Sequence, residues 1–196
     1  EYLTFALAKG RLATKTLSIL ETIGITCEEM KDKDSRKLIF VNEELKLKFF
    51  LAKGPDVPTY VEHGAADIGI TGYDLVKEKV ADVEILEDLK FGHTRLVIAA
   101  PENSDFKTVD DLKSVKTVAT EFPELTKQYF NEKDIPAKIF SLSGATEVAP
   151  LIGVADVIAD LTSTGTTLKM NHLREIDTII ESSVVLIDNK DSLKNN

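Results

Sequence analysis

Strand-like and helix-like segments alternate along almost the whole of this 196-residue chain. Residues 3–8 place apolar side chains at every second position, as a strand does, and residues 11–24 gather apolar side chains on one helical face. Strands are expected in the same way at 66–71, 94–100, 116–120, 138–142 and 156–160, with helical segments between most of them. This order predicts an α/β fold with largely parallel sheets.

Two interruptions of this pattern predict a two-lobed chain. Residues 101–104 break the alternation after a long apolar strand, and a strand near Ile179 returns toward the end of the sequence. We therefore expect residues 93–173 to form a second lobe, inserted into a discontinuous first lobe made of residues 1–92 and 174–196. Two lobes joined by two crossing strands would leave a cleft, which is a usual place for a ligand.

The segment 156–168, which reads DVIADLTSTGTTL, joins an apolar strand to a loop of small hydroxyl residues. The hydroxyl groups are hydrogen-bond donors, and Gly165 allows the backbone to turn so that N–H groups converge on one point. The residues that follow can begin a helix, whose N-terminus favours an anion. Asp160 stands at the strand end, where its carboxylate can bind sugar hydroxyls. We interpret the segment as a site for a phosphorylated ribose, with these loop residues around the phosphate: Thr162, Ser163, Thr164, Gly165, Thr166 and Thr167.

A plainer interpretation of the same loop stays open, because serine and threonine residues commonly form turns and cap helices. The order of strand, loop and helix favours the phosphate site. The chain contains neither a Walker sequence nor a Gly-x-Gly-x-x-Gly that opens a helix. A P-loop and a Rossmann dinucleotide site are therefore both disfavoured.

Composition argues against several other classes of function. The formal net charge of −9 disfavours general binding to nucleic acid, which requires a basic face. The single cysteine, Cys27, permits no internal disulfide and no cysteine-based metal cluster, and it fits a reducing cytoplasm. No apolar run is long enough to span a bilayer, and the first residues are expected to form a strand rather than a signal peptide.

Four stretches of the chain resemble the ATP phosphoribosyltransferase family, whose members catalyse the first step of histidine biosynthesis. The most specific stretch is a multi-position signature from Glu147 to Leu168, which includes Gly153, Asp160 and Gly165. AKGRL at 8–12, DVPTYVEHGAADIGITGYD at 56–74 and FGHTRLVIA at 91–99 are also similar to that family. The resemblance covers essentially the whole chain.

The resemblance implies a two-lobed type II periplasmic-binding-protein architecture and transfer of phosphoribosyl from phosphoribosyl pyrophosphate to N1 of the adenine of ATP. Mg²⁺ is expected to be bound mainly through the substrate phosphates, with no protein metal site. Because the sequence stops just after the strand that precedes the regulatory domain of long members, it resembles the short form. That form is implied to work with a histidyl-tRNA-synthetase-like regulatory subunit in a hetero-octamer.

Within this resemblance, Glu147 and Asp160 are the expected catalytic residues. Their carboxylates would bind the ribose 2- and 3-hydroxyls and offset the positive charge that develops at C1 as pyrophosphate leaves. The remaining catalysis would come from aligning the two bound substrates. Without the signature, a solvated helix residue is the plainer interpretation of Glu147.

An anionic substrate that approaches an acidic protein requires a local group of positive charges. Lys9 and Arg11 follow the first strand, at the strand end where α/β sheets bind ligands, and Lys53 and Arg95 are expected to add to them. A second small-residue loop contains Tyr73, which either stacks on adenine or packs in the core. The residues expected to bind ATP or pyrophosphate are Lys9, Gly10, Arg11, Lys53, Thr71, Gly72, Tyr73 and Arg95.

Two positions depart from the family pattern. Many relatives carry arginine where this chain has Lys53, and lysine keeps the charge but gives up bidentate recognition of phosphate. The family often has cysteine where this chain has Thr94.

Three other functions stay open from the sequence. A two-lobed solute-binding protein would share the cleft without catalysis. A phosphoribosyltransferase of the single-sheet fold usually has two adjacent acidic residues before its loop, whereas Leu161 follows Asp160 in this chain. A catalytically silent subunit of a larger complex is the third.

Overall fold

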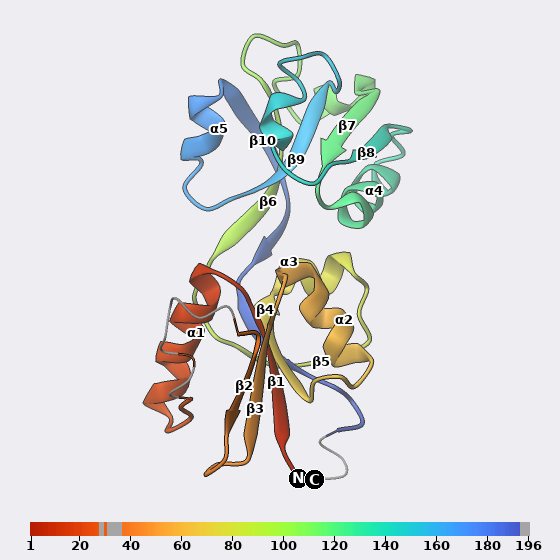
Figure 1. Ribbon diagram of the computed structural model, residues 1–196. Helices are drawn as coiled ribbons and strands as arrows, with labels where there is room; N and C mark the ends of the chain where they lie inside the picture. The colour runs from red at the N-terminus through yellow and green to blue at the C-terminus, as the bar shows by residue number, and fades with distance from the viewer. Residues whose placement is uncertain (28–29, 31–36, 193–196) are drawn as a thin grey trace. The chain divides into compact units, whose positions relative to one another are not determined.

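Buried apolar strands form two sheets in the computed structural model, which describes residues 1–27, 30 and 37–192 (Figure 1). Packing divides the chain into two compact units. Unit 1 comprises residues 1–92 and the segment that begins at Ser183, and unit 2 comprises residues 93–182. The sequence predicted that the second lobe ends at residue 173, whereas unit 2 ends at Ser182. The difference arises because the strand at residues 173–182 pairs within the sheet of unit 2.

The sheet of unit 1 has six strands in the order β2-β3-β1-β4-β11-β5. β1 runs parallel to both of its neighbours, and the other three pairings are antiparallel. Since parallel strands end at the same edge of a sheet, the residues that follow β1, β3 and β4 lie along one edge. The strands are β1 (Leu3–Ala8), β2 (Ile39–Asn42), β3 (Leu47–Ala52), β4 (Ile68–Gly72), β5 (Glu84–Asp88) and β11 (Val184–Asp188).

Helices cover both faces of this sheet (Figure 1). The alternation along β1 decides which side chains each face presents. Phe5 and Leu7 pack in a cluster with Leu20 of α1 (Arg11–Thr22), whereas the small Ala6 and Ala8 pack in a cluster with residues of α2 and α3. α2 comprises Val57–Glu62 and follows a 3-10 turn at Gly54–Asp56, and α3 comprises Tyr73–Glu78.

The sheet of unit 2 has five strands in the order β10-β6-β9-β7-β8. β7 is parallel to β8 and β9, whereas β6 is antiparallel to β9 and β10. None of the helices in the described residues is long and apolar enough to cross a membrane. The elements of unit 2 are β6 (Thr94–Pro101), a 3-10 turn (Asp110–Ser114), β7 (Thr117–Thr120), α4 (Pro123–Glu132), β8 (Lys138–Ser141), a 3-10 turn (Thr146–Val148), β9 (Val157–Thr162), α5 (Thr166–Met170) and β10 (Leu173–Ser182).

Two expectations about the strands are wrong. Both sheets are mixed and not largely parallel, because β2 and β3 form a hairpin and because β6, β10 and β11 enter their sheets antiparallel to a neighbour. The long strand expected near Ile179 is two strands in different sheets. β10 belongs to unit 2 and β11 to unit 1, with only Ser183 between them.

Candidate active site

The hydroxyl loop and Asp160 line one cavity in unit 2. β9 ends in the loop, and the cavity of about 290 Å³ is lined by Asp160, by the loop residues 162–164 and by the first residues of α5. Thr94 of the neighbouring strand β6 also lines this cavity. The structure therefore brings together the carboxylate and the hydroxyl groups that the sequence indicated.

Hydrogen bonds within the loop fix its shape. The Gly165 N–H donates to Thr162 Oγ1 at 2.9 Å, and the hydroxyl oxygens of Thr164 and Thr166 lie 2.8 Å apart. Gly165 has a φ of +82°, a conformation that glycine adopts without the steric cost of a side chain. Thr162 is buried and its hydroxyl accepts the hydrogen bond from Gly165 within the loop, while Ser163, Thr164, Thr166 and Thr167 are exposed.

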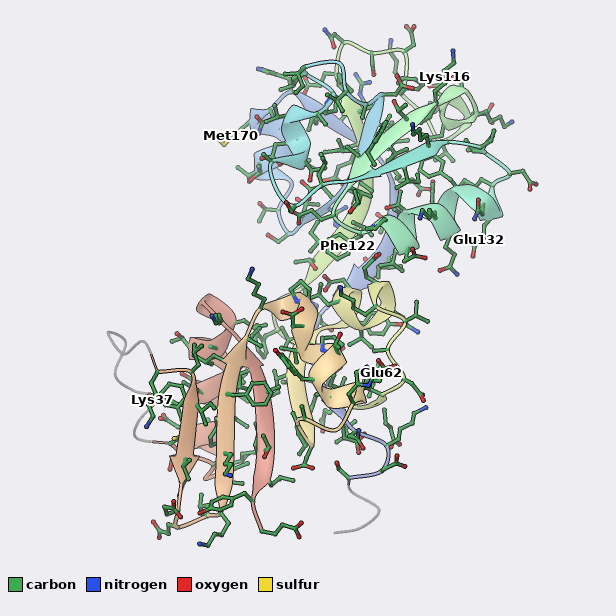
Figure 2. The ribbon with its side chains drawn as sticks, turned by 45° about the vertical axis from the view of Figure 1, so that its right-hand side comes forward. Lys37, Glu62, Lys116, Phe122, Glu132 and Met170 are labelled. Carbon is green, nitrogen blue, oxygen red and sulfur yellow. The ribbon has the colours of Figure 1, made fainter. Side chains whose placement is uncertain are left out.

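The short helix α5 is anchored on one side only. Leu168 is buried in the cluster that also contains Val97 of β6 and Ile158 of β9. Met170 is 75% exposed and points away from the strands (Figure 2). The anchoring by Leu168 keeps the first residues of α5, Thr166 and Thr167, at the cavity.

Asp160 sits in a partly buried and acidic environment. The pKa of its carboxyl is raised from 3.8 to about 6, mainly by burial and also by the charges of Glu147 and Glu121, against the lowering effect of the hydrogen bond donated by the Leu161 N–H. Glu147 is half-buried and lies in the 3-10 turn at Thr146–Val148, where the sequence predicted a helix. This turn contacts β9, and the charge of Glu147 acts on Asp160, so the two predicted catalytic carboxylates belong to neighbouring segments of unit 2.

Glu121 is a third carboxylate of this region that the sequence interpretation missed. It follows β7, which is parallel to β9, so both strands deliver an acidic residue to the same edge of the sheet. Its Oε1 lies 3.8 Å from the point that a Cβ at Gly144 would occupy. The signal that selected Asp160, an acidic residue at the carboxyl end of an apolar strand, applies equally to Glu121 and could have found it.

The three carboxylates do not form a metal-binding group. Among the residues that the structure describes, no cluster of three or more His, Cys, Asp or Glu side chains is arranged to hold a metal ion.

Arg95 was expected to bind substrate phosphates, and the structure places it in an ion pair. Its Nη1 and Nη2 donate to Glu175 Oε2 and Oε1 at 2.7 and 3.2 Å, and this pairing raises the pKa of Arg95. Arg95 also lines a cavity of about 230 Å³ together with Ser163 of the loop. Glu175 was not anticipated, because it lies 80 residues from its partner and in no recognisable motif.

Unit 1 carries a second group of predicted residues at one edge of its sheet. Ala8 of β1 pairs with Ala52 of β3, so Lys9 and Lys53, which follow them, occupy neighbouring positions, and both are exposed. Gly10 has a φ of +93° and precedes α1. Arg11 begins that helix, and its side chain lies outside the described part of the structure.

The second loop expected from the sequence is absent, because Thr71 and Gly72 are the last residues of β4 and Tyr73 begins α3 directly at the same edge of unit 1. Thr71 is fully buried and its hydroxyl donates to the Gly54 carbonyl at 3.4 Å, so this side chain holds the edge together. Tyr73 is half-buried against the cluster that contains Ala8, and the ammonium of Lys77 lies 5.4 Å from its ring centre. The packing role of Tyr73 is thus present in the structure, and stacking on adenine stays a prediction.

Comparison with known proteins identifies similar sequences over nearly the whole chain. The sequence profile of the HisG family, ATP phosphoribosyltransferase, matches residues 53–196. An ATP phosphoribosyltransferase of Methanothermobacter thermautotrophicus is 49% identical over 185 residues, which cover 94% of this chain and 63% of that protein. Another, from Lachnoclostridium phytofermentans, is 49% identical over 195 residues, or 99% of this chain and 90% of that protein. The chain thus spans less than two thirds of one relative and most of the other.

Solved structures agree with the sequence comparison. The ATP phosphoribosyl transferase (HisG:HisZ) complex from Thermotoga maritima contains a chain that matches with a TM-score of 0.83 and 31% identity, over 98% of this chain and 90% of that one. The periplasmic aliphatic sulphonate binding protein SsuA from Escherichia coli matches with a TM-score of 0.62 at 18% identity, over 100% of this chain and 64% of that one. The second match shows a shared fold and confirms the expected periplasmic-binding-protein-like architecture. Because the profile match covers more than half of the sequence and the relatives extend over nearly all of it, this chain belongs to the ATP phosphoribosyltransferase family.

Proposed function

We propose that this chain catalyses the condensation of ATP with phosphoribosyl pyrophosphate to give phosphoribosyl-ATP and pyrophosphate, the first step of histidine biosynthesis. The observation that carries the proposal is the cavity of unit 2, in which a hydroxyl loop and a carboxylate face the same space. A phosphate group and a ribose diol are the ligands that this pair of features suits. Family membership supports the same reaction.

The loop is proposed to hold the 5-phosphate of the donor. The exposed hydroxyls of Ser163, Thr164, Thr166 and Thr167 would donate to its oxygen atoms. The carboxylates of Asp160 and Glu147 would accept hydrogen bonds from the ribose hydroxyls, which fixes the sugar ring with C1 exposed to the acceptor.

The same carboxylates would stabilise the charge that develops during transfer. When the bond from C1 to pyrophosphate breaks, positive charge accumulates on the sugar, and a nearby carboxylate lowers the energy of that state. The pKa of about 6 leaves Asp160 mainly ionised at pH 7. N1 of adenine is already a nucleophile, so the protein needs only to align it with C1.

Mg²⁺ is proposed to enter with the substrates, held mainly by their phosphates. When bound to the pyrophosphate oxygens it supplies charge neutralisation for the leaving group. The protein would contribute the position of the donor, through the loop, and would leave most of the coordination shell of the ion to phosphate and water.

The edge of unit 1 is proposed to bind phosphates of ATP or of the leaving pyrophosphate. Lys9 and Lys53 are exposed cations at neighbouring positions, and Arg11 follows directly after Gly10 in the sequence. Tyr73 is a candidate for contact with the adenine ring. Lysine at position 53 makes this a point-charge contact with no bidentate geometry.

A regulatory partner is a further part of the proposal. The Thermotoga maritima protein of similar fold is a HisG:HisZ complex, which supports assembly of this chain with a HisZ-type subunit. A histidyl-tRNA-synthetase-like subunit in a hetero-octamer, acting in the cytoplasm, is the arrangement that we propose.

The test is an assay of the purified chain with ATP, phosphoribosyl pyrophosphate and Mg²⁺, with and without a HisZ-type partner. We expect phosphoribosyl-ATP and an equal amount of pyrophosphate in at least one of the two conditions. Binding of a ligand without product in either condition would contradict the enzyme and favour a solute-binding protein of the same fold.

A further inference from the structure

A carboxylate is packed directly against the loop that is proposed to bind a phosphate. Glu175 Oε1 lies 3.0 Å from the point that a Cβ at Gly165 would occupy, so the carboxylate lies directly against the loop at this glycine. Glu175 also lines a cavity of about 550 Å³ together with Thr164 and Gly165. The negative charge of Glu175 would repel a bound phosphate dianion, unless a nearby positive charge compensates it.

The ion pair with Arg95 compensates that charge. Two hydrogen bonds, at 2.7 and 3.2 Å, join the guanidinium to the carboxylate in a bidentate pair, and the two side chains are 30% and 33% exposed. Such a pair is nearly neutral when seen from the loop, whereas either member alone would present a full charge. The pair is held by two strands, since Arg95 lies on β6 and Glu175 on β10.

Other charged groups around the pair compensate it less well. Arg174 and Lys169 line the same cavity as Glu175, but Arg174 donates to the backbone carbonyl of Glu102 at 2.9 Å. Among the described residues, the ion pair of Glu175 is with Arg95 and not with Lys169. Glu181 lies opposite Arg95 in the register of β10 and β6. Its only effect on the pKa of Arg95 is a Coulomb interaction that is weaker than that of Glu175.

We propose that Arg95 is a positioning residue that acts through Glu175: it neutralises the carboxylate packed against Gly165, so that the loop can accept the donor phosphate. This differs from direct binding of substrate phosphates by Arg95. It rests on the proposed function, because it concerns the affinity of the same loop for phosphoribosyl pyrophosphate. Removal of either charge alone should therefore change the affinity for the donor, whereas removal of both should not.

The two roles predict opposite outcomes for a double variant. If Arg95 acts through Glu175, Arg95→Gln leaves an uncompensated carboxylate at the loop and raises the dissociation constant of phosphoribosyl pyrophosphate roughly tenfold. Glu175→Gln in the same chain removes that charge, and the double variant should return to within about threefold of the parent protein. If Arg95 binds the substrate directly, the double variant stays as weak as Arg95→Gln.

The measurement is calorimetric titration of phosphoribosyl pyrophosphate with Mg²⁺ into the parent chain, the two single variants and the double variant. Glu175→Gln alone leaves the charge of Arg95 uncompensated, so the constant should fall, by up to about tenfold. Arg95→Gln with Glu181→Gln is the matched control, because it also restores the net charge, and it should recover much less. The tenfold loss in Arg95→Gln should shrink as salt is raised from about 0.05 to 0.5 M, which a purely structural defect would not do.

Thermal unfolding of each variant separates loss of binding from loss of folding. An unchanged constant in Arg95→Gln, no recovery in the double variant, or equal recovery with Glu181→Gln would each overturn the inference. The proposed function fails differently: the parent chain would then neither bind phosphoribosyl pyrophosphate nor form phosphoribosyl-ATP. A parent that binds and turns over, with a double variant that is not rescued, contradicts the role of Arg95 alone.

Discussion

The two units present different chemistry at the ends of their parallel strands. In unit 2 the edge carries a loop shaped by its own hydrogen bonds, a buried Leu168 beneath it and a half-buried Asp160 beside it. In unit 1 the corresponding edge carries Lys9 and Lys53, which are exposed side chains on a surface. One edge would hold an anion with backbone and hydroxyl donors in fixed positions, and the other with mobile charges.

Substitutions at the two edges should therefore differ in their effects. Hydrogen-bond donors in fixed positions lose little entropy when a ligand binds. When a substitution removes one of them, a neighbouring group cannot take its place. Exposed lysines contribute less each, because water screens them and their side chains must be ordered on binding. We therefore expect large, specific losses in unit 2 and small, graded losses in unit 1.

The largest effect is expected for Gly165→Val. The new side chain would be strained at a φ of +82° and would meet Glu175 at 3.0 Å from its Cβ, so the loop must change shape. Binding of phosphoribosyl pyrophosphate, measured by calorimetry, should fall below detection while the chain stays folded.

The matched control is Gly24→Val, at a glycine with a φ of +83° and open space around its Cβ position. It carries a similar backbone strain outside unit 2. Equal loss of donor binding in the two variants would show that strain alone, and not the loop, explains the result.

Removing the carboxylates is expected to lower turnover next most strongly. Asp160→Asn and Glu147→Gln take away charge near the ribose, and each should reduce kcat about 100-fold, in line with the loss of one electrostatic contact to a transition state. Steady-state kinetics with both substrates measures this. Glu132→Gln, on the exposed end of α4 (Figure 2), is the control and should leave kcat unchanged. Parent-like rates in both site variants would leave the ribose role without support.

The pKa of Asp160 predicts opposite pH dependences for activity and for stability. Activity should fall as pH drops through about 6, because the carboxylate becomes neutral. The raised pKa means that the folded chain binds this proton more readily than the unfolded chain, so Asp160 lowers stability above pH 6 and that penalty disappears as pH falls from about 6 toward 4.

Asp160→Asn should therefore raise the free energy of unfolding at pH 7 by on the order of 1–3 kcal/mol, while turnover is lost. Denaturant unfolding at pH 7 and pH 4 measures this, and the gain should be absent at pH 4. A variant that is less stable than the parent at pH 7 would mean that the carboxylate makes favourable contacts that outweigh its burial.

The smallest effects are expected in unit 1. Lys9→Ala and Lys53→Ala should each raise the KM for ATP or for phosphoribosyl pyrophosphate roughly threefold to tenfold, according to which phosphates the edge binds. Lys79→Ala, an exposed lysine just after α3, is the control. Losses in unit 1 that exceed those in unit 2 would reverse the comparison between the two edges.

Local patterns predicted the elements well but not how strands join sheets. The helix expected at residues 11–24 ends at Thr22, and Gly24 has the left-handed conformation of a helix stop. The sequence near Ile179 predicts one continuous strand, because apolar residues continue past Ser182. Its division between two sheets depends on pairing with β6 in one unit and with β4 in the other. Such pairings involve residues far away in sequence, which a local period does not encode.

The candidate site shows the same limit. Asp160, Gly165 and the loop hydroxyls could be predicted because they adjoin one strand end. Glu121 was accessible to the same argument and was missed. The pairing of Arg95 with Glu175 could not be predicted, since only the folded sheet brings β6 and β10 together.

A crystal structure of the chain with phosphoribosyl pyrophosphate and Mg²⁺ would show which edge binds the donor. We expect the 5-phosphate to lie within hydrogen-bond distance of the hydroxyls or N–H groups of residues 163–167, and the ribose hydroxyls to contact Asp160 or Glu147. A 5-phosphate bound at Lys9 and Lys53, with the loop of unit 2 empty, would contradict it.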